Sequence, residues 1–301
     1  MAEPFRGIFS IAHTPYDADG VLLWDDLQRC ADWIVRAGAH GLVWPVMASE
    51  YTTISYPERV QGMKAVVNAV AGRVPVVIGV ADVSASGAAS LASEAASAGA
   101  NGVIAMPPWG TKMADHGLIE AYYRGIAKAC GLPVIIQNVG PPLGSNLPGQ
   151  FVVSLCERVE GVSYLKEEKD PKGQVLTEVL SLGSDKVKGV FSGSQCRWLV
   201  GDFLRGATGS MPGPHVTDVD VLIWEKLEAG EIQAAREIHA AKMVLENILL
   251  SMPVGSGKHV MVRRGVISSP ARRNSGLRPL DRWDIAELDY GLSVVAPYFR
   301  I

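Results

Sequence analysis

The sequence predicts an α/β protein: a (β/α)8 barrel followed by a C-terminal helical extension. Up to about residue 215, short apolar runs alternate with longer stretches of helical period, and this strand–helix unit occurs eight times. Beyond that point the apolar runs stop and only helical segments follow. A doubly wound open sheet is the alternative, but no Gly-x-Gly-x-x-Gly pattern follows the first strand.

The expected strands are apolar on both faces, as parallel strands covered by helices are. They span residues 7–12, 41–46, 74–80, 102–106, 133–138, 162–166, 187–192 and 207–211. The expected barrel helices span residues 24–37, 56–71, 86–98, 118–130, 149–159, 173–182, 195–205 and 218–229. Further helices at 231–251, 257–265 and 282–295 complete the chain. We therefore expect a catalytic barrel over residues 1–229 and a helical domain over residues 230–301.

Local signals support individual helices. Asp25 and Asp26 stand in the first turn of the first helix, where the helix dipole favours acidic side chains. Gly38 follows its last turn and suits a C-terminal cap. Pro57 stands at the start of the second helix, a position where proline is tolerated.

Composition excludes several classes of function. The chain has 301 residues, 48% of them hydrophobic, and a net charge of -3, so neither a nucleic acid nor an anionic membrane is an expected partner. No apolar run is long enough to span a bilayer, and residues 1–7 lack the apolar core of a signal peptide. The four cysteines are widely separated, and the six histidines form no paired ligand motif. We expect a cytoplasmic protein without a metal site.

Lys166 is the candidate reactive residue, because it closes the apolar run that begins at Val162. Burial disfavours an ammonium group, so a buried lysine can carry the neutral amine that a Schiff base needs. The alternative is that the strand simply reaches solvent at Lys166, and this stretch alone favours that alternative. Reactive groups of such barrels, however, gather at the carboxyl ends of the strands. The other expected ends carry hydroxyls, amides and imidazole (His13-Thr14, Ser49-Glu50, Gln137-Asn138, Ser192-Gly193 and Ser210), and in this setting Lys166 is favoured as a Schiff-base residue.

These strand ends resemble the dihydrodipicolinate synthase / N-acetylneuraminate lyase family of Schiff-base aldolases and their dehydratase relatives. The resemblance covers almost the whole chain, in the order and spacing of several short landmarks. These are Thr14-Pro15, Ser49-Glu50, the Gly-Arg-Val-Pro-Val run at 72–76, Pro107-Pro108, the Lys166 strand and the Gly-Ala-Thr-Gly run at 206–209. The resemblance implies a TIM barrel, a homo-oligomer (dimer or tetramer), no separate cofactor, and a Schiff base between Lys166 and a 2-oxo acid.

Departures from the family pattern count against aldol chemistry. The family run Gly-Thr-Thr-Gly-Glu is Val46-Met-Ala-Ser-Glu50 here, so both threonine hydroxyls are absent. Gln137 replaces the tyrosine that ends strand five, Trp109 aligns with a tyrosine from the neighbouring subunit, and the substrate-binding arginine aligns near Pro142. Glutamine cannot act as a general base, although it can orient a substrate.

The 2-keto-3-deoxy-L-arabonate dehydratase subgroup matches more closely, at Gln137, Ser49-Glu50 and Glu168. By this resemblance Lys166 condenses with the C2 ketone, and Glu168 removes the C3 proton or assists the departure of the C4 hydroxide. Gln137 contacts the substrate. Glu168 could equally be a solvated acid.

The remaining predicted site residues bind the substrate. Backbone N–H groups of Ala48 and Ser49, together with the Ser49 hydroxyl, are expected to hold the carboxylate; the alternative for Ser49 is a hydroxyl that stabilises a turn. We expect the sugar-acid pocket to be lined by Ser192, Gly193 and Ser210 and capped by Trp109.

The sequence therefore predicts a cofactor-free lyase that forms a Schiff base with a small-molecule 2-oxo acid and eliminates water. A pyruvate-dependent aldolase or synthase of the same family is the first alternative, and a deaminase is a related elimination. A non-catalytic paralogue that binds a sugar acid is the alternative from a different class.

Overall fold

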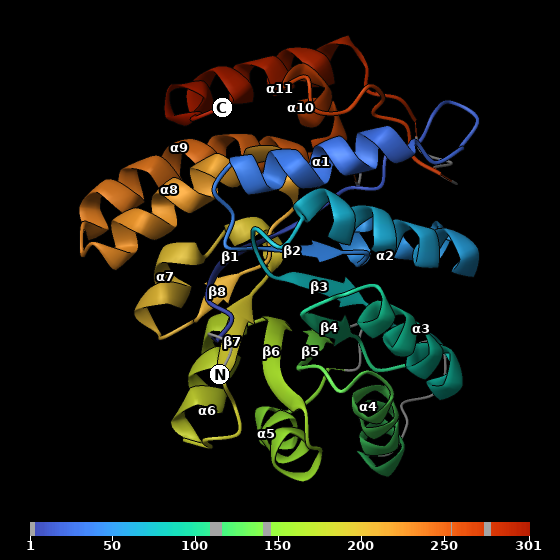
Figure 1. Cartoon of the computed structure of the whole chain (residues 1–301). Coiled ribbons are helices and arrows are strands. Elements are labelled where there is room, and N and C mark those ends of the chain that lie inside the picture. Colours follow the sequence, from blue (N-terminus) through green and yellow to red (C-terminus); the bar gives the residue numbers. More distant parts are fainter. Residues whose placement is uncertain (1–3, 109–115, 141–145, 254, 274–277) are drawn as a thin grey trace. The chain divides into compact units, whose positions relative to one another are not determined.

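A computed structural model of the protein describes residues 4–108, 116–140, 146–253, 255–273 and 278–301. In these residues eight strands form a closed barrel in sequence order, β1 to β8 (Figure 1). The strands from β3 to β8 pair in parallel, and β8 pairs in parallel with β1. Helices alternate with the strands and continue after β8. The predicted (β/α)8 barrel with C-terminal helices is confirmed.

The strands are β1 Gly7–Ile11, β2 Gly41–Trp44, β3 Val76–Gly79, β4 Gly102–Ala105, β5 Val134–Val139, β6 Val162–Glu168, β7 Gly189–Ser192 and β8 Gly209–Ser210. The helices are α1 Trp24–Arg36, α2 Tyr56–Val70, α3 Ala85–Ser97, α4 His116–Cys130, α5 Gly149–Arg158, α6 Lys172–Ser181, α7 Leu199–Leu204, α8 Thr217–Glu228, α9 Ile232–Ser251, α10 Gly257–Arg263 and α11 Arg282–Val295.

Two elements differ from the prediction in ways that matter for the site. Strand β6 continues to Glu168, so Lys166 is not its last residue. The ladder to β5 persists there, with Val139 paired to Glu168. Helix α7 begins at Leu199 and not at residue 195, because Ser194, Gln195 and Cys196 have φ of 57°, 58° and 56°. This left-handed conformation cannot continue a right-handed helix.

The chain folds as two compact units. Unit 1 comprises residues 1–9 and 75–211, and unit 2 comprises residues 10–74 and 212–301. The expected domain boundary at 229/230 falls inside unit 2, between α8 and α9, and it stays a prediction.

Unit 1 has an aromatic cluster beneath the candidate lysine. The ring of Tyr164 on β6 stacks on Phe5 at 5.2 Å, and Phe191 on β7 meets Phe9 edge-on at 5.1 Å. Strand side chains alternate between faces, so Tyr164 and Lys166 share one face of β6. The side chain of Lys166 therefore lies next to this aromatic cluster on the same face of β6.

Unit 2 is mainly helical, and helix α9 packs against both α8 and α11 (Figure 1). Two capping boxes fix helix starts: Ser55 with Glu58 at α2, and Asp281 with Asp284 at α11. No helix in the described ranges is both long enough and apolar enough to cross a membrane.

Lys242 forms a buried ion pair between α8 and α9. Its Nζ lies 2.5 Å from Asp220 Oδ1 and 3.6 Å from Glu246 Oε1, and both side chains of the closer pair are fully buried. Burial raises the pKa of Asp220 to about 6, although the charge of Lys242 opposes the rise. The carboxylate therefore depends on Lys242 for its ionised form.

We predict that Lys242→Met lowers the free energy of unfolding by about 3–5 kcal/mol, because the variant leaves a buried carboxylate unpaired. Lys226→Met is the matched control, since Lys226 also joins a carboxylate at the end of α8 but its pair with Glu231 is exposed. The control should cost less than about 1 kcal/mol. Guanidinium unfolding followed by circular dichroism measures both, and equal losses in the two variants would contradict the prediction.

Candidate active site

Lys166 lies in the interior of β6, with its side chain only 3% exposed. In the ladder it is paired with Gln137 on β5 and with Phe191 on β7. Glu168 is two residues further along β6 and therefore lies on the same face. Hydrogen bonding to both neighbouring strands fixes the backbone of Lys166, so its amine has a defined position.

Lys166, Glu168 and Gln137 form one cluster. The Nζ of Lys166 lies 3.1 Å from Oε2 of Glu168. The same oxygen accepts a hydrogen bond of 2.6 Å from the Gln137 amide. The backbone N–H of Ser194 lies 3.4 Å from the other carboxylate oxygen. The three residues predicted to be catalytic are therefore in contact, and Glu168 connects them.

The environment of Glu168 favours its ionised form. Burial raises the pKa of its carboxyl group, but the positive charge of Lys166 and the hydrogen bonds from Gln137, Lys166 and Ser194 outweigh burial. The resulting pKa lies below the ordinary value. Glu168 is a carboxylate at neutral pH, and it can exchange a proton with the amine beside it.

The turn after β7 is shaped to receive Glu168. A Cβ atom at Gly193 would lie 2.4 Å from Cγ of Glu168, so only glycine leaves room for the carboxylate. Residues 194–196 then adopt the left-handed conformation, which costs roughly 1–2 kcal/mol for each residue. Such strain concentrates at functional sites. Here it accompanies the approach of the Ser194 N–H to Glu168.

Ser192 and Ser210 lie at the ends of β7 and β8 and are joined by hydrogen bonds. The Ser192 hydroxyl donates to Ser210 Oγ at 3.1 Å, and the Ser210 hydroxyl donates to the Ser192 carbonyl at 3.0 Å. Both side chains are buried. Their protons are committed within the protein, and contact with a substrate stays a prediction for both.

Ala48 and Ser49 belong to unit 2, in a 3-10 turn that follows β2. The Ser49 hydroxyl donates to the Ala12 carbonyl at 2.7 Å, and its N–H donates to the Val46 carbonyl at 2.9 Å. The N–H of Ser49 thus closes the turn, and its hydroxyl joins the turn to the segment that follows β1. The predicted role of these two residues in carboxylate binding stays a prediction.

Glu50 follows in the left-handed conformation, with φ of 57°. Its carboxylate accepts a hydrogen bond of 2.5 Å from Lys258 on α10, a lysine that is 1% exposed. Lys258 also donates to the Ala271 carbonyl at 2.9 Å. Glu50 therefore joins the turn after β2 to α10 and to the segment around Ala271.

Two sequence expectations fall outside the described residues: Trp109, and the position of the family arginine near Pro142. Among the residues that the structure describes, no group of three or more His, Cys, Asp or Glu side chains could hold a metal ion.

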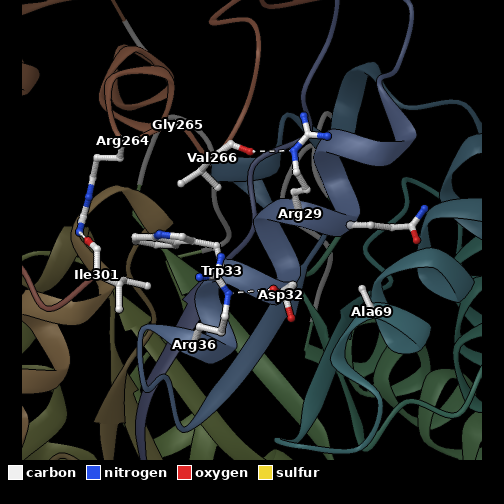
Figure 2. A pocket seen from close by; sticks show the side chains of 10 residues that line it. Arg29, Asp32, Trp33, Arg36, Ala69, Arg264, Gly265, Val266 and Ile301 are labelled. Carbon is white, nitrogen blue, oxygen red and sulfur yellow. Dashed lines mark hydrogen bonds and ion pairs between the residues drawn. The ribbon is translucent and has the colours of Figure 1, made fainter.

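A cavity of about 510 Å³ lies in unit 2 (Figure 2). Its lining includes Trp33 and three arginines, and each arginine is already paired with an acid: Arg29 with Asp26, Arg36 with Asp32, and Arg264 with Asp218. None of the predicted site residues lines it. We place the candidate active site at Lys166 instead, where three predicted site residues are in contact.

Sequence reasoning missed one pair of site-supporting residues. Asn138 follows Gln137, and Glu167 follows Lys166, so both face away from the cluster. The two are fully buried, and Asn138 Nδ2 donates to Glu167 Oε2 at 2.9 Å. Burial raises the pKa of Glu167 to about 7, and its hydrogen bonds offset only part of the rise. The available signal was a run of adjacent polar residues at the end of two apolar strands, Gln137-Asn138 and Lys166-Glu167-Glu168.

Comparison with known proteins adds three findings. The profile of the dihydrodipicolinate synthetase family matches residues 4–282. The L-2-keto-3-deoxyarabonate dehydratase of Azospirillum brasilense is 29% identical over 272 residues, which cover 89% of this chain and 88% of that protein. The Escherichia coli protein named "Probable 2-dehydro-3-deoxy-D-pentonate aldolase YjhH" is 28% identical over 249 residues, 82% of each chain.

Among solved structures, YagE of Escherichia coli K12 has a similar fold. This prophage protein of the dihydrodipicolinic acid synthase family was crystallised in complex with pyruvate. Its TM-score is 0.89 at 23% identity, over 97% of this chain and 99% of that one.

Glu167 predicts a pH dependence of stability. Its pKa is about 7 in the folded protein against an ordinary value of 4.5, so between these pH values the folded state binds more protons than the unfolded state. Its contribution to stability is therefore full below pH 4.5 and is lost as the pH rises towards 7. The loss is at most about 3 kcal/mol, at 1.36 kcal/mol for each pKa unit.

Glu167→Gln removes this titration. From pH 5 to pH 8 the wild type should lose stability relative to the variant, as measured by urea unfolding at each pH. A difference in unfolding free energy that stays constant with pH would contradict the assignment.

Proposed function

Because the chain belongs to the dihydrodipicolinate synthetase family, whose members are Schiff-base-forming lyases, we propose that it dehydrates a 2-keto-3-deoxy sugar acid. The observation that carries the proposal is the contact of Lys166 with Glu168 at 3.1 Å, with Gln137 on the same carboxylate. One nucleophile and one acid–base group on a single strand face are the equipment for a Schiff-base elimination.

The first half of the reaction uses both groups. The ammonium of Lys166 passes a proton to Glu168, and the neutral amine attacks the C2 ketone. Glu168 returns that proton to the carbinolamine hydroxyl, which leaves as water and gives the iminium. Glu168 is then a carboxylate again, at the place where the next proton must be removed.

The second half is the elimination. The iminium acidifies the C3–H bond, and Glu168 takes this proton to give the enamine. The enamine expels the C4 hydroxide, which takes the proton from Glu168 and leaves as water. No carbon–carbon bond breaks and no redox partner is required. With a 2-keto-3-deoxypentonate, the unsaturated iminium tautomerises so that C5 becomes an aldehyde, and hydrolysis of the iminium then frees Lys166 and the semialdehyde.

Gln137 supports elimination over aldol cleavage. Cleavage between C3 and C4 requires a base at the C4 hydroxyl, and an amide cannot serve as that base. Its amide is also already used to hold Glu168, at 2.6 Å. The dehydratase of Azospirillum brasilense provides independent support for this reaction class.

Aldol cleavage or synthesis with pyruvate is the second candidate. It would use the same Schiff base at Lys166, and the relative from Escherichia coli is named as an aldolase. A non-catalytic sugar-acid-binding paralogue has less support, because the Schiff-base lysine of the family pattern is kept as Lys166 and lies in contact with Glu168. We further propose that no separate cofactor takes part and that the chain forms a homodimer or homotetramer.

We predict that sodium borohydride with pyruvate adds one covalent adduct to the wild type, read by intact mass, and none to Lys166→Ala. Lys172→Ala is the matched control, since Lys172 is also buried (5% exposed) and paired with an acid, Asp170. It should form the adduct as the wild type does. The absence of an adduct in the wild type with pyruvate or 2-keto-3-deoxypentonates would falsify the proposal.

Glu168→Gln should form the adduct more slowly but still reach it at equilibrium, and it should lower kcat for dehydration by about 10²–10⁴, because the general acid–base group is lost. Turnover of 2-keto-3-deoxypentonates should yield a semialdehyde and water. Release of pyruvate as the main product would favour the aldolase and would show that Gln137 does not prevent cleavage. Coupled dehydrogenase assays for the semialdehyde and for pyruvate distinguish the two.

A further inference from the structure

The two strands that carry the candidate site also share a buried contact on their other face. Strands β5 and β6 pair Gln137 with Lys166 and, one step along, Asn138 with Glu167. Side chains alternate between the faces of a strand. Gln137, Lys166 and Glu168 therefore occupy one face, and Asn138 and Glu167 occupy the opposite face of the same two strands.

Glu167 uses both of its carboxylate oxygens. Oε2 accepts a hydrogen bond of 2.9 Å from the Asn138 amide, and Oε1 accepts one of 2.6 Å from the backbone N–H of Lys169. The second bond spans Glu168 and fixes the backbone on its far side. The position of the chain immediately after Glu168 thus depends on Glu167.

Asn138 extends the contact to a third segment. Its amide nitrogen also donates to the Leu147 carbonyl at 3.1 Å, and its amide oxygen accepts from the Leu147 N–H at 2.8 Å. Asn138 and Glu167 are both fully buried, so water does not compete for these bonds. We call Asn138, Glu167 and their four hydrogen bonds the brace.

We propose that the brace is a positioning device for catalysis: Glu167 and Asn138 hold β5 and β6 in the register that places Glu168 between Lys166 and Gln137. The inference rests on the proposed function for its catalytic consequence, although the brace itself is a structural statement. Neither residue touches the reacting atoms. They act by keeping Gln137 and Glu168 in their 2.6 Å contact.

The brace requires a hydrogen-bond acceptor at each of the two terminal atoms of residue 167. Two N–H donors face its two oxygens, so a glutamine would turn its own NH₂ group towards one of them. Aspartate at position 138 would instead place two carboxylates together. The double variant Glu167→Gln with Asn138→Asp restores one donor and one acceptor between the strands, although it loses the bond to the Leu147 carbonyl.

Loss of the brace should lower the rate of proton removal from C3 more than the amount of Schiff base present at equilibrium. Lys166 lies inside the ladder and keeps its backbone bonds to both neighbouring strands. Glu168 is the last residue of β6, so its position depends on the backbone beyond the strand. A shift of about 1 Å in an acid–base group can cost roughly 100-fold in rate.

The test compares wild type, Glu167→Gln, Asn138→Asp and the double variant. Borohydride trapping after equilibration with pyruvate reports the amount of iminium, and exchange of the pyruvate methyl hydrogens in D₂O reports the rate of proton removal by Glu168. In Glu167→Gln we expect trapping to stay within about 3-fold and methyl exchange to fall by about 10- to 100-fold. The double variant should recover at least part of the exchange lost in each single variant.

Tyr164→Phe is the matched control for general destabilisation. Tyr164 lies on the same strand, and its buried hydroxyl accepts a hydrogen bond from the Phe5 N–H at 3.1 Å, away from Glu168. This variant should lower the Tm yet keep trapping and methyl exchange within about 2-fold of wild type. If Glu167→Gln behaves in the same way, or lowers trapping and exchange equally, the positioning role is overturned.

Amide hydrogen exchange tests the brace independently of any reaction. The amides of Leu147 and Lys169 should exchange faster in Glu167→Gln than in wild type and Tyr164→Phe, and unchanged exchange overturns the brace. If wild-type protein forms no adduct, the proposed function fails, and these two amides alone decide whether the brace exists.

Discussion

The candidate site depends on the ion pair between Lys166 and Glu168. An ammonium that is 3% exposed is unfavourable unless a charge or several acceptors compensate it, and Glu168 supplies both an opposite charge and a hydrogen-bond acceptor at 3.1 Å. The pair also solves a chemical problem. A Schiff base requires a neutral amine, and a carboxylate in contact can take the proton without bulk water. In the proposed reaction, the same contact that makes burial tolerable also provides an acceptor for the ammonium proton.

The surroundings of this pair are arranged around Glu168. Gln137 donates to it from β5, the Ser194 N–H approaches from the left-handed turn, and Gly193 leaves the space it occupies. Two of these features are unfavourable by themselves: the left-handed turn is strained, and the glycine at position 193 contributes no side chain to the packing. A fold selected only for stability gains nothing from them. Their presence around one carboxylate is the reason for assigning Glu168 the proton transfers of the proposed elimination.

The barrel could be predicted from sequence because it depends on periodicity, and alternating strand and helix patterns survive small errors at each boundary. The cluster at Lys166 could be predicted because strand ends of a parallel barrel meet. The left-handed turn at 194–196 could not, since its residues are Ser, Gln and Cys, and composition does not encode the sign of φ without glycine. The brace could not be predicted, because the partner of a buried polar side chain depends on the register of the strands, which the sequence does not give.

Adjacent acids on β6 show how one strand separates two roles. Glu168 faces the charge of Lys166 and several donors, and its pKa lies below the ordinary value. Glu167 accepts its hydrogen bonds from two neutral N–H groups, and burial raises its pKa to about 7. Environments that move the pKa values of two carboxyl groups in opposite directions commonly indicate different functions for the two groups. Glu167 has the value expected of a general acid at neutral pH, yet it lies on the face away from Lys166. Geometry therefore outranks pKa here: we assign the proposed proton transfers to Glu168, which touches the amine, and the proposed positioning role to its neighbour Glu167.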